Sequence, residues 1–184
     1  MTAAQRRWAA ELLHFWFHHM PQRLWFARDD ALDAVLRRRF GRELAALRKR
    51  PAREFLRDRQ TARAAVLLFD QLPRNMHRDS ARAFASDPLA RAIAKGAIAR
   101  GWHRGLGKHE KQFLFMPLMH SEAIADQRRS LRLFTALGDM AITRFARAHA
   151  GMVVRFGRFP HRNAVLRRRS APAELRAIAA GNHW

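Results

Sequence analysis

Apolar positions recur at helical spacing along nearly the whole chain. Trp8, Leu12, Phe15 and Trp16 stand at i, i+4, i+7 and i+8, so they fall on one face of a helix. Pro21 follows this stripe and is expected to end the helix. No segment alternates apolar and polar residues with the period of two that a half-buried strand requires. The pattern predicts an all-α protein.

Capping residues, glycines and prolines divide the rest of the chain into further helices. Asp87-Pro88 combines a capping side chain with a proline at the first helical position. The predicted helices number seven to nine and pack as antiparallel pairs. Leu44 and Leu47 suggest a short continuation after Gly41, and Asp79-Ser80 is expected to cap a short segment. After the first, the longer ones run from Asp29 or Asp30 to Gly41, from Arg59 to Phe69, from Asp87 to about Arg100, from about Lys108 with an interruption at Pro117, from about Ser121 to Leu137, from Asp139 to about Arg155 and from Ser170 to Gly181.

The length and the residue types suit a single soluble domain. A chain of 184 residues is long enough for one hydrophobic core, so one all-α domain over residues 1–184 is expected. Cysteine is absent, which removes disulfide and thiolate chemistry. Glu11 and His14 interrupt the apolar N-terminal stretch, unlike a signal peptide, and no later run approaches a membrane span in length. We expect a cytoplasmic protein without a membrane partner.

The formal net charge of +21 is large for this length, and such a field attracts nucleic acid, anionic lipid or acidic proteins. The basic residues are nearly all arginine and spread along the chain, with clusters at 37–39, 48–50 and 167–169. None of these clusters is interleaved with aromatic side chains, as a stacking platform for nucleic acid would be. A solvated basic surface is therefore favoured, and nucleic-acid binding stays an alternative.

Two acidic polar segments interrupt the apolar framework. DQLPRN at 70–75 follows an apolar helix face, and Asp70 is expected near the helix C-terminus, where a carboxylate needs a cationic or donor partner. HSE at 120–122 leads into Asp126, four residues after Glu122. The two carboxylates are expected on one helix face, as a like-charge pair that needs neutralising.

A third polar segment, RFGRFPHRN at 155–163, carries the complementary cations. Its arginines can clamp carboxylates through bidentate hydrogen bonds. We therefore predict that the three segments meet in one polar network. In the alternative interpretation the arginines cap helix carbonyls, Asn163 caps the next helix and Pro160 fixes the turn, so the segment has only a structural role.

The ordered motifs of the chain resemble those of a known family. Over about residues 11–180 the chain is similar to an uncharacterised bacterial family, domain of unknown function 924. The resemblance implies an all-α, tetratricopeptide-like superhelical fold and no activity, because the family has no established function. The motifs that carry it are LLHFWF at 12–17, DQLPRNM at 70–76, FASDP at 84–88, FMPLMHSE at 115–122, DQ at 126–127 and RFGRFPHRN at 155–163.

The resemblance also marks the polar residues of these motifs as candidate ligand-binding residues. The chain departs from the family pattern at 166–171, where LRRRSA replaces a leucine-glycine-arginine run followed by Ser-Thr, so no ligand contact is assigned to that turn. The candidates are Asp70, Gln71, Arg74, Asn75, His120, Ser121, Glu122, Gln127, Arg155, Arg158, His161, Arg162 and Asn163.

Metal binding and nucleophilic catalysis are both disfavoured at these residues. His120 and His161 with one carboxylate could form a metal set, but His120 and Glu122 diverge on a helix and the nearby arginines repel a cation. Neither a metal nor a cofactor is predicted. Ser121 cannot form a triad with its direct neighbours. General acid–base catalysis by His120 or His161 with Glu122 stays open, as in a small-molecule hydrolase or transferase.

Binding without chemistry is the favoured function. We expect a tetratricopeptide-like domain whose polar pocket holds a small anionic ligand or the acidic segment of a partner protein. In this interpretation Arg158 and Arg162 bind the anion, and His161 or His120 is the titratable group. Asp70 and Glu122 would orient the arginines.

Overall fold

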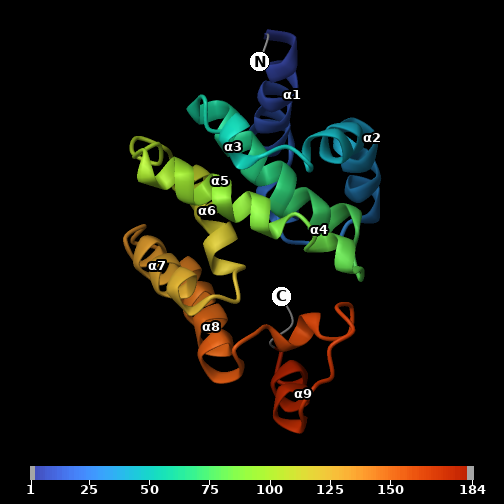
Figure 1. Ribbon diagram of the computed structural model, residues 1–184, viewed down its shortest axis with the longest axis vertical. Helices are drawn as coiled ribbons and strands as arrows, with labels where there is room; N and C mark the ends of the chain where they lie inside the picture. Colours follow the sequence, from blue (N-terminus) through green and yellow to red (C-terminus); the bar gives the residue numbers. More distant parts are fainter. Residues whose placement is uncertain (1–2, 182–184) are drawn as a thin grey trace. The chain divides into compact units, whose positions relative to one another are not determined.

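The computed structural model describes residues 3–181, with side chains from Arg7 onward, and its regular structure is entirely helical (Figure 1). In this part of the chain, α-helices are joined by short 3-10 and π-helical turns, and no strand occurs. The predicted all-α class is confirmed. The α-helices are α1 (Ala3–His14), α2 (Asp30–Leu47), α3 (Arg59–Val66), α4 (Leu72–Met76), α5 (Asp87–Ala99), α6 (Lys108–Met119), α7 (Ile124–Thr135), α8 (Met140–Phe156) and α9 (Pro172–Ala179).

Two of the predicted helix starts are capped as expected. The Asp29 carboxylate accepts a hydrogen bond of 2.8 Å from the backbone N–H of Leu32 at the start of α2. The Asp139 carboxylate accepts from the backbone N–H groups of Ala141 and Ile142 at the start of α8. Each cap satisfies N–H groups that have no partner within the helix.

Two predicted interruptions are wrong. α2 continues through Gly41 to Leu47, and α6 continues through Pro117 to Met119. The helix face with Phe40 and Leu44 is buried on both sides of Gly41, so tertiary packing outweighs the local preference of glycine. Pro117 likewise stands between buried apolar side chains that hold α6 in place.

The helical context of the two acidic segments also differs from the prediction. Asp70 does not lie at a helix C-terminus, because α3 passes into a π-helical turn, Leu67–Gln71, that leads directly into α4. Nearly every side chain from 61 to 73 is buried, and this burial stabilises the continuous helical conformation of the segment. Glu122 does not share a helix face with Asp126, because α7 begins only at Ile124.

Internal packing divides the chain into two compact units, and one domain over residues 1–184 stays a prediction. The first unit comprises Met1–Arg78 and Arg82–Leu114, and the second comprises Asp79–Ala81 and Phe115–Trp184. The boundary falls inside α6. Within the described residues no helix is long and apolar enough to cross a membrane.

Each unit has its own aromatic contacts. In the first unit α3 packs against α1 and α5, and edge-to-face pairs join Trp16 to Phe113 and Phe55 to Phe69, with ring centroids 5.4 and 5.2 Å apart. In the second unit α7 and α8 form a hairpin closed by residues 136–139, as Figure 1 shows. The ring centroids of Phe115 and Phe134 lie 6.0 Å apart in this unit.

Candidate functional site

The three polar segments are distributed over the two units. DQLPRN lies in the first unit, and HSE, Gln127 and RFGRFPHRN lie in the second. The second unit brings HSE and RFGRFPHRN together, as described below. The convergence of all three segments stays a prediction.

In the first unit, Arg74 forms a bidentate ion pair with Asp87 at the start of α5. Its Nη1 and Nη2 donate to Asp87 Oδ1 and Oδ2 at 2.8 and 3.0 Å, and Nη1 lies 3.5 Å from Asp70 Oδ1. Burial lowers the pKa of Arg74, but the charges of Asp70 and Asp87 outweigh it and raise the pKa above its ordinary value. Arg74 therefore stays charged, and its guanidinium ties α4 to α5.

Asn75 takes part in a second polar contact of the first unit, with Asp33 of α2. Asn75 Nδ2 donates to Asp33 Oδ1 at 3.0 Å, and Arg78 Nε donates to Asp33 Oδ2 at 2.5 Å. Asp33 is buried, and the sequence reasoning missed it. A carboxylate on the same helix face as Leu36 and Phe40 was the available signal, because an acid on an apolar stripe requires buried donors.

In the second unit, the residues after His120 hold the turn between α6 and α7. Ser121 Oγ donates to Asp126 Oδ2 at 2.8 Å, and Gln127 Nε2 donates to the carbonyl oxygens of Met119 and Ser121 at 2.7 and 2.5 Å. Ser121 Oγ also accepts from the backbone N–H of Ala123 at 3.2 Å. The Ser121 and Gln127 side chains thus fix the backbone that carries His120 and Glu122.

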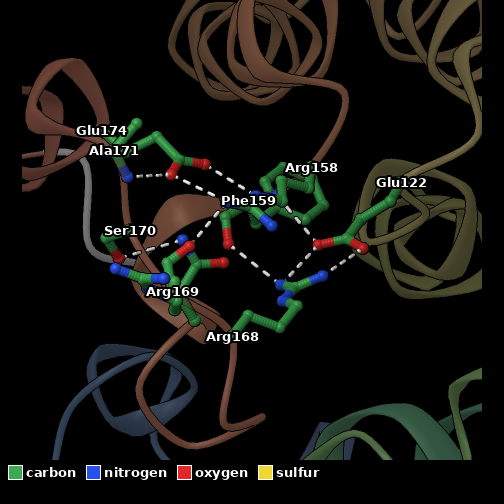
Figure 2. Close-up of polar contacts among 9 residues, drawn as sticks. Glu122, Arg158, Phe159, Arg168, Arg169, Ser170, Ala171 and Glu174 are labelled. Carbon is green, nitrogen blue, oxygen red and sulfur yellow. Dashed lines mark hydrogen bonds and ion pairs between the residues drawn. The ribbon is translucent and has the colours of Figure 1, made fainter.

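Glu122 joins HSE to the loop that contains RFGRFPHRN (Figure 2). Arg168 Nη1 and Nη2 donate to its Oε2 and Oε1 at 2.8 and 3.0 Å, and the Phe159 N–H donates to Oε1 at 2.8 Å. Burial raises the pKa of Glu122, but the hydrogen bonds from Arg168 and Phe159 outweigh it, so the pKa lies below its ordinary value. Glu122 is ionised at neutral pH, and it orients Arg168, a partner that the sequence analysis did not name.

Arg158 is paired with Glu174 of α9, which the sequence reasoning missed (Figure 2). Arg158 Nε and Nη2 donate to Glu174 Oε1 and Oε2 at 2.7 and 2.8 Å, and the Ala171 N–H donates to Oε2 at 2.7 Å. The hydrogen bond from Arg158, followed by that from Ala171, lowers the pKa of Glu174 to about 2. The signal in the sequence was a glutamate three residues after the start of a helix, which is a capping position.

Three histidines and Arg162 cluster around Phe159 in the second unit. The ring centroids of His120 and His149 lie 6.0 Å apart, those of His149 and Phe159 5.5 Å, and those of Phe159 and His161 5.7 Å. The Arg162 guanidinium carbon lies 4.5 Å from the Phe159 ring centroid. His120, His149 and Arg162 are buried, and His161 is half-buried. We name this group the histidine–arginine cluster.

His149 is neutral within the cluster. Burial first, and then the charge of His120, lower its pKa to about 3, and Arg162 and His161 act in the same direction. Its Nδ1 lies 2.8 Å from the Phe145 carbonyl oxygen, which can only accept, so Nδ1 carries the proton. The sequence reasoning missed His149, although it stands on the same α8 face as Ala146 and Val153.

The remaining candidate residues lie outside the cluster. Arg155 is exposed, with its guanidinium 4.9 Å from the Phe156 ring centroid. Asn163 Nδ2 donates to Ser170 Oγ at 3.0 Å, so Asn163 braces its own loop. Gln71 Nε2 donates to the neighbouring Asp70 carboxylate at 2.5 Å. Among the described residues, no group of three or more histidines and carboxylates has the geometry to hold a metal ion.

The comparisons with known proteins agree with the helical architecture. Residues 12–182 match a family model described as bacterial protein of unknown function (DUF924). The chain is also similar to the solved structure of ATU0120, a protein of unknown function from Agrobacterium tumefaciens. The two are 37% identical with a TM-score of 0.88, over 97% of this chain and 98% of that one. No curated protein matches.

Proposed function

The chain belongs to a bacterial family of unknown function, DUF924, and we propose that it binds a small anionic ligand at the histidine–arginine cluster of its second unit. The observation that carries the proposal is the gathering of Arg162 with His120, His149 and His161 around one aromatic ring. After burial, the charges of His120, Arg162 and His161 lower the pKa of His149. A carboxylate or phosphate group is the species that such a set stabilises.

Three other arginines of the two units are less suited to a ligand. Arg158 is neutralised by Glu174, Arg168 by Glu122 and Arg74 by Asp87, each through two hydrogen bonds. A guanidinium whose donors already face a carboxylate would have to give up that partner to take a ligand. Arg158 is therefore a brace of the loop, and the histidine–arginine cluster is the site that we propose for the anion.

Catalysis by Glu122 receives little support from its surroundings. A general acid must be protonated at the working pH, and the lowered pKa of Glu122 keeps it ionised. As a base it would be weak for the same reason. His120 and His161 are the groups left for a hydrolase or transferase, which stays the second candidate because three imidazoles adjoin a buried arginine.

The proposal also includes the tetratricopeptide-like superhelical arrangement. Its support is the resemblance of the motifs together with helices that pack as neighbouring pairs, such as α7 and α8. In such scaffolds paired helices present side chains to a bound partner. Nucleic-acid binding by the exposed arginines is the remaining alternative, and a steep loss of binding with rising salt would favour it.

Calorimetric titration of the full chain with sulfate, phosphate and malonate tests the anion site. We expect at least one of these anions to bind, and Arg162→Gln to weaken it by about tenfold or more. Arg155→Gln removes the same charge from an exposed position and is the matched control. His161→Gln provides a second, half-buried variant if Arg162→Gln fails to fold. Equal affinity in the wild type, Arg162→Gln and His161→Gln would contradict the proposal, as would no binding of any of the anions.

A further inference from the structure

The solvent face of α8 carries a second feature that the cluster does not use. Met140, Arg144, Arg147, Gly151 and Val154 stand at i, i+4, i+7, i+11 and i+14, and all five are exposed. We name this line the α8 stripe. Met140 and Val154 are 83% and 71% exposed. The spacing repeats every seven residues, which is the spacing at which one helix contacts another along its length.

Gly151 has no reason within the chain to be glycine. It lies inside α8 with a helical backbone, and a Cβ built there meets nothing within 4 Å. Glycine in a helix interior costs about 1 kcal/mol relative to alanine. Where no neighbouring atom of the protein needs the space, the missing side chain leaves room for the backbone of a partner.

The charge of the stripe is positive and uncompensated. Neither Arg144 nor Arg147 takes part in an ion pair with any residue that the structure describes. Arg128 and Arg132 of α7 are exposed as well. The α7–α8 hairpin therefore offers arginines to solvent beside bare apolar side chains.

We propose that the α8 stripe docks an acidic amphipathic helix of a partner protein. Glutamates or aspartates at the centre of that helix would pair with Arg144 and Arg147, and apolar residues toward its ends would cover Met140 and Val154, about 21 Å apart along α8. Arginine, methionine and aromatic residues are the types enriched at protein interfaces.

Other occupants fit the stripe less well. A second copy of the chain, paired through its own α8, would bring Arg147 or Arg144 against the same residue of its partner, and like charges in contact oppose association. Nucleic acid would use the arginines and leave Met140 and Val154 bare. An anionic membrane would draw on charge and apolar side chains but would gain nothing from the space at Gly151.

The test uses the full chain and a fluorescein-labelled synthetic peptide of eighteen or so residues, designed as a helix with two central glutamates and leucines toward both ends. Fluorescence anisotropy should show saturable binding. The double charge reversal R144E/R147E and the blocking change Gly151→Leu should each weaken it by about tenfold or more. The charge-matched control R38E/R42E alters two exposed arginines of α2 and should leave the affinity within about twofold of the wild type.

Gly151→Ala separates docking from folding. It should raise the melting temperature by about 2 to 4 °C, because alanine is the better helix former, and should still weaken peptide binding. Loss of peptide binding in R38E/R42E equal to that in R144E/R147E would overturn the proposal in favour of diffuse charge. So would the absence of peptide binding, or binding that is insensitive to Gly151→Leu. Self-association through α8 in sedimentation, or tighter binding of duplex RNA or of phosphatidylserine vesicles than of the peptide, would also overturn it.

Discussion

Arg168 reaches across 46 residues of sequence to form a bidentate ion pair with Glu122. The same carboxylate accepts the backbone N–H of Phe159, and Arg168 donates to the Phe159 carbonyl at 3.3 Å. The pair therefore fixes the backbone N–H and C=O of Phe159, the residue whose ring lies at the centre of the histidine–arginine cluster.

Removing either partner of this pair should destabilise the second unit. Glu122→Gln and Arg168→Gln should each lower the free energy of unfolding by about 1–3 kcal/mol, because the remaining charge keeps its desolvation cost without its partner. Urea unfolding followed by circular dichroism measures this. The double variant should cost less than the sum of the two single ones, since the residues interact directly. Single variants within about 0.5 kcal/mol of the wild type would contradict a structural role for the pair.

Removing the Asp33 carboxylate should destabilise the first unit. Asp33→Ala leaves the side chains of Asn75 and Arg78 without their carboxylate, and loss of one partner from a buried pair costs about 3–5 kcal/mol. Asp30→Ala is the matched control on the same helix, because its side chain is exposed and its contact with Arg28 is a solvent-facing one. Chemical denaturation of both variants should separate them clearly, and equal stabilities would show that Asp33 is dispensable.

The neutral state of His149 predicts a dependence of stability on pH. Its folded pKa of about 3 lies below the ordinary value of 6.5, so below pH 6.5 the unfolded chain takes up a proton that the folded chain refuses. The stability that neutral His149 allows is therefore fully present above pH 6.5, and the free energy of unfolding decreases progressively as the pH falls toward 3. His149→Gln should reduce the change in the free energy of unfolding between pH 6.5 and pH 3.

Nuclear magnetic resonance titration gives the direct measurement. The ring proton signals of His149 should stay constant from pH 8 to about pH 4. A midpoint near pH 6.5 for His149 would show that it is neither buried nor surrounded by cations as described.

Two glycines of the α8 region should respond in opposite ways to the same change. Gly157 ends α8 with a φ of 69° in the left-handed region, where a Cβ is strained, so Gly157→Ala should destabilise by about 1 kcal/mol. Gly151 is helical with open space around it, so Gly151→Ala should stabilise by about 0.5–1 kcal/mol. Thermal unfolding of both variants should shift the midpoint in opposite directions, and shifts of the same sign would mean that one backbone conformation differs from that described.

The sequence predicted the helices whose signals are local. The predicted caps Asp29 and Asp139 depend only on neighbouring residues and are confirmed, and the helix predicted to end at about Arg155 ends at Phe156. Gly41 and Pro117 were misjudged because burial of distant side chains decides whether a helix continues through a weak residue. No single-sequence rule weighs that burial.

The candidate site was predicted only in part, because long-range packing also decides which of its charged side chains pair. HSE and RFGRFPHRN come together in the second unit through the Glu122 carboxylate and the backbone N–H of Phe159, and the arginine that pairs with Glu122, Arg168, lies outside the predicted segment. The identity of the partners was missed, since Glu122 pairs with Arg168 and Arg158 with Glu174. Opposite charges in a sequence with many arginines leave several pairings open, and the path of the loop chooses among them. His149 was missed because a lone histidine on a buried helix face is most often read as core.

The π-helical turn at Leu67–Gln71 makes the spacing of the DQLPRN motif a matter of rotational phase. A π turn holds one more residue than an α turn, so it absorbs that residue without the rotation of about 100° that the residue would add in an α-helix. Arg74 and Asn75 face Asp87 and Asp33 in the phase that this wider turn sets. If the same residues were wound as a regular α-helix, every side chain of the motif would be kept and both would be rotated away from their partners. The contacts of the motif therefore depend on the π-helical winding of this segment as well as on its residue types.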